Sequence, residues 1–217
     1  MPIKGLIFDF DGLILDTETP EVVAWINIYR KYGQKFDFDK YAPFIGTVCR
    51  MIAPAQELAR LVPGLNAETV FNEWLVIEKR LIEKESILPG VREYLQESKK
   101  LDLKVAIASS SEKPWVVSHL ERLGIHQFFD FIHTVDETKI PKPNPALYLL
   151  ALESLKAEPN EVIAFEDSTN GVSAAKTAGI FCVAIPNPTT KSLPLDQADL
   201  ILESLAHLPL TQLLERF

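Results

Sequence analysis

Four polar clusters in the sequence contain side chains suited to chemistry on a phosphate group. The clusters are Asp9-Phe10-Asp11-Gly12, Ser109-Ser110-Ser111, Lys142 in a proline-rich segment, and Glu166-Asp167-Ser168. Each comes after an apolar run of the length typical of a buried strand. Ligands of an open parallel sheet bind beyond the carboxyl ends of its strands. We therefore expect the four clusters to meet at one edge of such a sheet.

The acidic members of these clusters predict a site for a divalent cation. Carboxylates that are brought close together repel one another unless a cation lies between them. Magnesium prefers oxygen ligands, keeps several waters and also binds substrate phosphate. We predict a Mg²⁺ site formed by the side chains of Asp9, Asp167 and Glu166 and by the backbone carbonyl of Asp11.

The same clusters provide groups for catalysis. Asp9 can act as a nucleophile and form an aspartyl-phosphate. Asp11 lies two residues further on, where it can protonate the leaving alcohol and then activate water. Lys142 can neutralise charge on the transferred group. We expect the Ser109 hydroxyl to hold a phosphate oxygen, with Ser110 beside it in the phosphate site.

Taken singly, each cluster also has a simpler interpretation. Asp-x-Asp-Gly suits a calcium loop or an ordinary turn, and a serine run suits a helix cap. We predict Ser111 as the N-cap of one helix, and Asn144 and Pro145 as the N-cap and first residue of another. The placement of all four clusters after successive strands favours the catalytic interpretation over four unrelated local features.

The elements that would position these groups alternate between strand and helix. Apolar runs predict strands at 3–8, 103–108, 131–134, 162–165 and 181–185, and helical patterns lie at 90–100, 112–123, 145–156, 170–178 and 205–217. This alternation predicts an α/β fold, a Rossmann-like parallel sheet with helices on both faces. Residues 17–86 contain only helical patterns, which predicts a helical-bundle cap inserted into a core formed by 1–16 and 87–217.

The composition narrows the choice of partners. The chain has 217 residues, 47% of them apolar, and a formal net charge of -8. An acidic surface repels nucleic acid and anionic membranes, so we expect neither as a partner. We expect a small phosphorylated metabolite instead, bound by a monomer. Three aspartates interrupt the apolar N-terminus, which therefore does not fit a signal peptide, and we expect a cytoplasmic protein. The two cysteines, Cys49 and Cys182, form no metal-binding spacing, so we expect them to be free thiols.

The motifs that contain the four polar clusters resemble those of a known family. DFDGLILDTE, IASSS, PKPNP and FEDSTNGVSAAKTAG are similar to the four signature motifs of the haloacid dehalogenase superfamily, in order and over most of the chain. Within it, the chain resembles the beta-phosphoglucomutase-like phosphatases. The resemblance implies Asp9 as nucleophile, Asp11 as acid and base, Ser109 and Lys142 in the phosphate site, and Glu166 and Asp167 at the metal. It also implies a Rossmann-like core and a mobile cap.

One departure from the family pattern bears on the reaction. Mutases of this subfamily carry a sequence similar to Asp-Thr-x-x-x-His just after the first motif. In this chain, Glu21 occupies the position of that histidine. This favours hydrolysis over a sugar-phosphate mutase. The presence of Asp11 disfavours halide displacement. A non-catalytic phospho-acceptor module is the alternative from another class, but such modules are shorter and lack an inserted cap.

The predicted cap is expected to select the substrate. We place three of its polar residues near the substrate, namely Thr17, Glu18 and Arg50. Arg50 could clamp a second anionic group. The three tryptophans, Trp25, Trp74 and Trp115, are expected to pack in cores rather than to stack on a ligand.

Overall fold

The computed structural model describes residues 2–41 and 52–217, which divide into two compact units. The first unit combines Met1–Leu15 with Ser86–Phe217, and the second is the intervening segment Asp16–Glu85. The bounds are close to those expected for a core and an inserted cap, and the function of the second unit as a cap stays a prediction.

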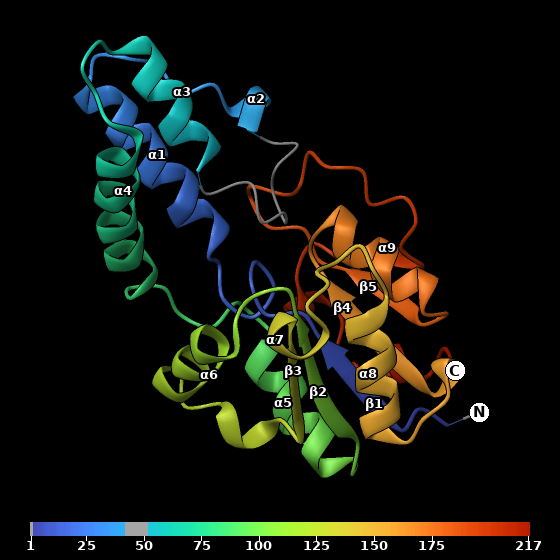
Figure 1. Cartoon of the computed structure of the whole chain (residues 1–217). Helices are drawn as coiled ribbons and strands as arrows, with labels where there is room; N and C mark the ends of the chain where they lie inside the picture. Colours follow the sequence, from blue (N-terminus) through green and yellow to red (C-terminus); the bar gives the residue numbers. More distant parts are fainter. Residues whose placement is uncertain (1, 42–51) are drawn as a thin grey trace. The chain divides into compact units, whose positions relative to one another are not determined.

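The first unit is built on a parallel sheet, which confirms the predicted α/β class (Figure 1). Its strands in the described residues are β1 (Gly5–Phe8), β2 (Lys104–Ser109), β3 (Phe131–Thr134), β4 (Val162–Glu166), β5 (Phe181–Ala184) and β6 (Leu200–Ile201). Their order is β3-β2-β1-β4-β5-β6, and each neighbouring pair is parallel. The first strand of the chain therefore lies inside the sheet, between two strands that come about a hundred residues or more later.

Helices cover both faces of this sheet. They are α5 (Val91–Lys100), α6 (Lys113–Arg122), α7 (Val135–Thr138), α8 (Ala146–Leu155), α9 (Thr169–Thr177) and α10 (Leu210–Leu214). Figure 1 shows α8 and α9 on one side of the strands and α5 and α6 on the other. Successive side chains of a strand point to opposite faces of the sheet, so they pack against the two layers of helices in turn. Ile7 of β1 joins the core beneath α8 and α9. Phe8 instead stacks on Phe165, and the Phe165 ring packs edge-on against Tyr94 of α5.

The predicted strands and helices agree with the structure to within two residues at each end, apart from three regions. The short strand β6 and the single turn α7 were not predicted. The helix expected over 205–217 is wrong, because the structure has a 3₁₀ turn at Leu205–His207 and the five-residue α10. Pro209 lies between them, and proline inside a helix removes a backbone hydrogen bond and clashes with the preceding turn.

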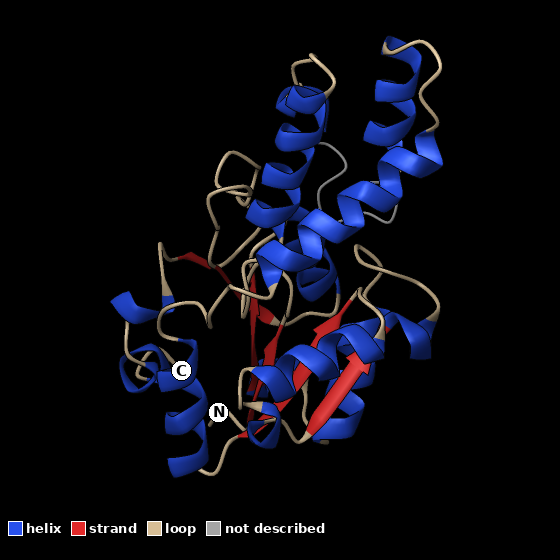
Figure 2. Cartoon of the chain, turned by 90° about the vertical axis from the view of Figure 1, so that its left-hand side faces the viewer, coloured by secondary structure: helices blue, strands red, loops and turns tan. Residues whose placement is uncertain are grey.

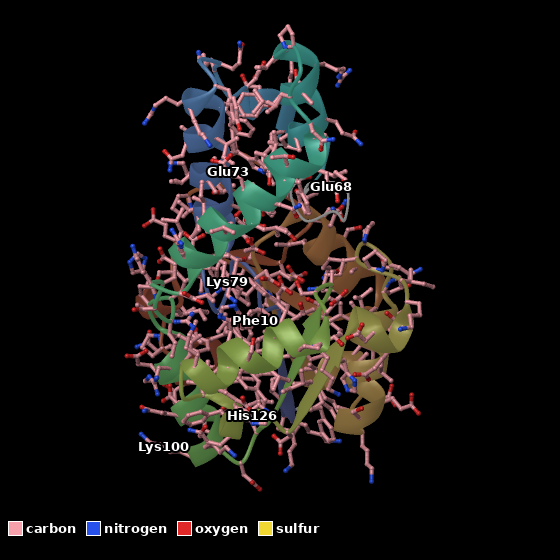
Figure 3. All side chains as sticks on the ribbon, turned by 60° about the vertical axis from the view of Figure 1, so that its left-hand side comes forward. Phe10, Glu68, Glu73, Lys79, Lys100 and His126 are labelled. Atoms are coloured by element: carbon pink, nitrogen blue, oxygen red, sulfur yellow. The ribbon has the colours of Figure 1, made fainter. Side chains whose placement is uncertain are left out.

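Among the described residues of the second unit, the regular elements are all helices, as predicted. Its helices are α1 (Glu18–Lys31), α2 (Phe38–Tyr41), α3 (Ala53–Leu61) and α4 (Ala67–Ile82), drawn in blue in Figure 2. Trp25 and Trp74 are fully buried and stack at 4.9 Å between ring centroids, which joins α1 to α4 and confirms their predicted packing role. Lys31 Nζ adds an ion pair to Glu73 of α4 at 2.6 Å. Figure 3 labels Glu73 on this helix.

Two further expectations concern thiols and membranes. Cys182 is a buried free thiol, as expected, and Cys49 lies outside the described residues. In the part of the chain that the structure describes, no helix combines the length and the apolar character needed to cross a bilayer.

Candidate active site

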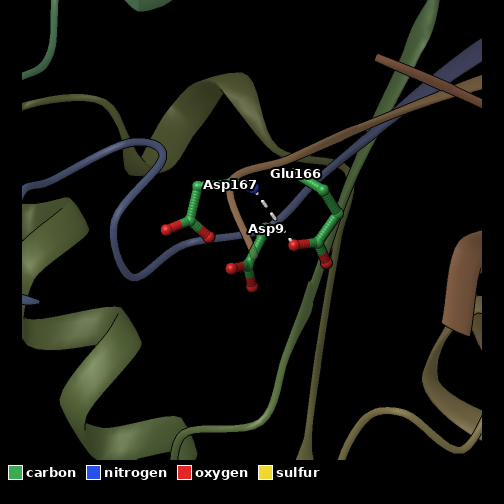
Figure 4. Close-up of side chains that lie close together, drawn as sticks. All are labelled: Asp9, Glu166 and Asp167. Carbon is green, nitrogen blue, oxygen red and sulfur yellow. Dashed lines mark hydrogen bonds between the residues drawn. The ribbon is translucent and has the colours of Figure 1, made fainter. Parts of the chain in front are cut away.

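Three carboxylates meet at the carboxyl edge of the sheet, where β1 and β4 end. Phe8 pairs with Phe165 in the β1–β4 ladder, and the backbone N–H of Asp9 continues it by donating to Phe165 O at 3.0 Å. This register sets Asp9 beside Glu166 and Asp167. One oxygen from each of the three side chains lies within 4.8 Å of the others, and all three are buried (Figure 4). The expected meeting of the first and fourth clusters is therefore found.

Lys142 links two of these carboxylates. Its Nζ donates to Asp9 Oδ1 at 2.7 Å and to Glu166 Oε1 at 2.5 Å. Only 5% of the lysine is exposed, so both ion pairs are shielded from water. The Ser110 hydroxyl accepts a hydrogen bond from the Lys142 backbone N–H at 3.1 Å. This bond brings the second and third clusters to the same edge as the other two.

Burial and charge act in opposite directions on these groups. Burial, followed by the negative charge of Glu166, raises the pKa of Asp9 to about 8, although Lys142 offsets part of the shift. Burial alone would lower the pKa of Lys142, but the attraction of Asp9 and Glu166 outweighs it and raises that pKa above its usual value. The lysine is therefore held as a cation, whereas one ammonium does not fully compensate the buried acidic groups.

The donor set fits a hard divalent cation. Three buried carboxylates lie close together here, and the ammonium of Lys142 forms ion pairs with two of them, Asp9 and Glu166. Buried charges of this kind require pairing or a metal. The donors are all oxygen atoms, which suits magnesium, calcium or manganese and not zinc in a thiolate site. Asp9, Glu166 and Asp167 are the side chains that could hold such a cation.

Tyr148 is a member of the site that the sequence analysis missed. This α8 residue is fully buried, and its hydroxyl donates to Glu166 Oε1 at 2.5 Å. The Lys142 Nζ also lies 5.2 Å from the centre of its ring. Burial, with the nearby charge of Glu166, raises the pKa of Tyr148, so its proton stays on the hydroxyl. Tyr148 therefore fixes the carboxylate to which Lys142 is bound.

Asn187 is a second missed residue, and it holds Asp167. Its Nδ2 donates to Asp167 Oδ2 at 2.8 Å and to the Gly12 carbonyl at 3.2 Å. Its Oδ1 accepts from the backbone N–H groups of Thr189 and Thr190 at 2.8 and 3.0 Å. The amide is thus fixed at both ends. It ties the loop after β5 to the first and fourth motifs and sets the orientation of a predicted metal ligand.

We expect Asn187→Ala to weaken binding of a divalent cation. Loss of a partner that orients a metal ligand typically lowers affinity by about 10–100-fold. Titration of the purified protein with MgCl₂, followed by calorimetry, measures the change. Asn160→Ala is the matched control, because Asn160 is exposed in the turn before β4 and should bind as the wild type does. An Asn187→Ala protein with unchanged affinity would contradict this role.

Gly171 gives Glu166 the room it needs. It lies in the first turn of α9, and its N–H donates to the N-cap Ser168 hydroxyl at 3.1 Å. A Cβ at this position would overlap the carboxyl group of Glu166. Glycine is therefore required at this position because the Glu166 carboxyl group comes so close. The backbone conformation does not require it, because the φ of Gly171 is not in the left-handed region.

We expect Gly171→Ala to destabilise the protein, although alanine is the better helix former by about 1 kcal/mol. The added methyl group must displace a buried carboxylate that two other side chains hold, and overpacking of this kind costs about 1–3 kcal/mol. Urea unfolding measures the free energy. Ser173→Ala, on the same helix, should be neutral or slightly stabilising. A gain in stability from Gly171→Ala would show that Glu166 is free to move.

Asp11 faces different partners from the other carboxylates. Ser111 Oγ donates to its Oδ2 at 2.6 Å, and Trp115 Nε1 donates to its Oδ1 at 2.9 Å. Two predictions are therefore wrong. Ser111 does not cap a helix, because α6 starts at Lys113 with Glu112 at its N-cap. Trp115 is only partly buried, and its indole N–H binds Asp11 instead of lying within a core.

The other predicted residues lie in the following places. Ser109 ends β2, is buried, and accepts from the Ser111 N–H at 3.0 Å. The predicted cap at Asn144 is shifted by one residue, because α8 begins at Ala146 with Pro145 as its N-cap, although Asn144 Oδ1 does accept from the Ala146 N–H at 3.0 Å. Thr17 and Glu18 lie at the start of α1 in the second unit, and Arg50 lies outside the described residues. Substrate contacts of these three remain predictions.

Known proteins are similar to this chain in sequence and in fold. YhcW of Bacillus subtilis, which is assigned as a phosphatase, is 42% identical over 214 residues, covering 98% of this chain and 97% of its own. The phosphorylated carbohydrates phosphatase of Thermotoga maritima is 34% identical over 181 residues, covering 82% of each chain. The crystal structure of beta-phosphoglucomutase from Clostridium difficile matches with a TM-score of 0.75 and 26% identity, covering 99% of this chain and 96% of that one.

The family comparison covers most of the chain. A model of the family described as haloacid dehalogenase-like hydrolase matches residues 6–185, which include all four polar clusters. Together with the phosphatase names of the relatives, this match confirms the resemblance predicted from the motifs and the prediction of a phosphoric monoester hydrolase. The chain belongs to the haloacid dehalogenase-like hydrolases.

Proposed function

We propose that this protein is a Mg²⁺-dependent phosphatase that hydrolyses a small phosphorylated sugar through a phosphoryl group carried on Asp9. The observation that carries the proposal is the buried group of Asp9, Glu166 and Asp167, with Lys142 bonded to two of them. The name of the Thermotoga maritima relative, a phosphorylated carbohydrates phosphatase, supports the substrate class.

The two oxygens of Asp9 have different surroundings. Lys142 Nζ holds Oδ1, whereas Oδ2 accepts no hydrogen bond from the described residues. Oδ2 is therefore the oxygen available to attack phosphorus. As it attacks, the bond from phosphorus to the ester oxygen breaks, and the ester oxygen keeps the electron pair. A bound Mg²⁺, held by Asp9, Glu166, Asp167 and the Asp11 carbonyl, would supply positive charge to the phosphate.

Asp11 completes both halves of the reaction. In the first half its carboxyl group gives a proton to the ester oxygen, which leaves as an alcohol. In the second half the resulting carboxylate takes a proton from water, and the water oxygen attacks phosphorus. The bond between phosphorus and Asp9 then breaks, and its electron pair returns to the carboxylate. Lys142 stays charged throughout and stabilises negative charge on the nucleophile and the transferred group.

The likeness to a beta-phosphoglucomutase raises a second candidate, a sugar-phosphate mutase. Glu21 replaces the histidine that the mutase pattern carries, and in the structure its carboxylate is buried and accepts a hydrogen bond from the Tyr41 hydroxyl at 2.7 Å. That side chain is thus engaged within the second unit. This observation supports hydrolysis as the reaction.

A panel of phosphorylated sugars, assayed for free phosphate, tests the proposal. We expect phosphate release with MgCl₂ and none after treatment with a chelator. With glucose 1-phosphate isomers, a hydrolase gives free phosphate, whereas a mutase accumulates glucose 6-phosphate. Absence of metal-dependent release across sugar phosphates and aryl phosphates would contradict the proposed function.

A further inference from the structure

The carboxylate of Asp11 is held by two donors of different chemistry. Trp115 Nε1 donates to Oδ1 at 2.9 Å, and Ser111 Oγ donates to Oδ2 at 2.6 Å. An indole N–H can only donate a hydrogen bond, whereas a hydroxyl can donate or accept. Oδ1 must therefore stay an acceptor for as long as its bond to Trp115 lasts. Oδ2 can gain a proton without losing its partner, because the Ser111 hydroxyl can turn and accept.

The indole is itself fixed in place. Trp115 lies in the first turn of α6, and its ring packs edge-on against His119, 4.4 Å away between centroids. The His119 ring in turn lies 6.2 Å from the ring of Phe10, the residue between Asp9 and Asp11. The tryptophan is thus braced against the same segment of chain whose carboxylate it holds. A side chain placed in this way can set the direction of the Asp11 carboxyl group.

We propose that Trp115 is a positioning residue for the acid of this reaction, anchoring Asp11 by Oδ1 so that Oδ2 is the oxygen that passes the proton. The proposal rests on the proposed function and adds a residue and an atom to it. As the phosphorus–ester oxygen bond breaks, the leaving oxygen keeps the electron pair and takes the proton from Oδ2. Asp11 is left as a carboxylate, with its bond to Trp115 intact throughout.

The leaving group reveals whether the acid is correctly placed. A sugar alkoxide is a poor leaving group and needs a proton, whereas 4-nitrophenolate leaves readily without one. General acid catalysis typically contributes about 10²–10⁴-fold, so partial misplacement should cost about 10–100-fold. We expect Trp115→Phe, which keeps a ring and removes the N–H, to lower kcat/KM by that amount for a sugar phosphate. For 4-nitrophenyl phosphate we expect a change of no more than about twofold.

Two further variants complete the experiment. Asp11→Asn should show the same dependence on the leaving group, and adding Trp115→Phe to it should cause no further loss with the sugar phosphate, as in a double-mutant cycle for coupled residues. Ser118→Ala is the control on α6, because this exposed hydroxyl bonds only the Trp115 carbonyl, at 2.9 Å. It should leave both substrates unaffected. The ratio of two kcat/KM values does not depend on the fraction of folded enzyme, so partial unfolding cannot imitate the result.

The possible outcomes separate this inference from the function on which it rests. Equal losses on the two substrates, no loss on either, or a further loss in the Asp11→Asn background would each overturn the positioning role. In those cases Asp11→Asn alone would still show its selective loss. If Asp11→Asn showed no dependence on the leaving group, the assignment of Asp11 as the acid, and with it the role of Trp115, would be wrong.

Discussion

Asp9→Asn is expected to abolish hydrolysis while leaving the protein folded. An amide oxygen is a poor nucleophile, and loss of a catalytic nucleophile typically lowers kcat by about 10⁴–10⁶-fold. The same change removes one of the buried carboxylates that compete for Lys142. We therefore expect the free energy of unfolding to be unchanged or higher. Phosphate release with MgCl₂ measures the first effect, and urea unfolding measures the second.

The control for this variant is Asp102→Asn. Asp102 is exposed after α5 and has a φ of 55°, a backbone conformation that asparagine also adopts. It should keep full activity and stability. Turnover close to that of the wild type in the Asp9→Asn protein would end the proposal that Asp9 carries the phosphoryl group. The assay must follow fresh preparations over time, because an asparagine at this position could deamidate and restore the aspartate.

Lys142→Met is expected to be the most destabilising of the variants considered. It removes the ammonium that two buried carboxylates share and leaves both without their cation. Breaking a buried ion pair from one side costs about 3–5 kcal/mol, because an uncompensated charge stays behind. Urea unfolding at neutral pH measures this loss. Hydrolysis should fall by about 10²–10³-fold or more, since a preorganised charge at the transferred group is lost.

Two variants show whether burial and charge cause this loss. Lys104→Met removes a lysine from an ion pair with Asp130 at 2.9 Å, with 57% of the lysine side chain exposed. An exposed pair contributes about 0–1 kcal/mol, so this control should change stability little. Lys142→Met combined with Glu166→Gln should recover part of the stability but none of the activity. A loss from Lys142→Met as small as that from Lys104→Met would contradict the buried network.

The fold could be predicted because its strands carry strong local signals. β1, β2 and β4 are almost entirely buried, so they appear in the sequence as short apolar runs, each followed by polar residues. β6 has no such signal. It is two residues long, Leu200 and Ile201, and its place depends on pairing with β5. α7 is a single turn and likewise too short for a periodic pattern.

The site was predictable only where its residues follow strands. Asp9, Glu166 and Asp167 were found because the carboxyl ends of parallel strands converge. Tyr148 was missed because it lies inside α8 among apolar residues, where the pattern reads as core packing. Asn187 was missed because its contact with Asp167 spans 20 residues and depends on the path of a loop. The monomeric state and the cytoplasmic location remain predictions.

The chain leaves and re-enters the first unit at neighbouring points, and this has a consequence for how the protein can change during evolution. Leu15 forms a bridge to Ile87, and the Leu88 N–H donates to Ile14 O at 2.9 Å. The two ends of the intervening segment are therefore side by side within the first unit. Lengthening a closed loop adds little entropic cost, about 0.6 kcal/mol for each doubling of its length. Segments of very different size can thus be grafted between Leu15 and Ser86, which makes this portion of the chain interchangeable while the buried carboxylates of the first unit stay where they are.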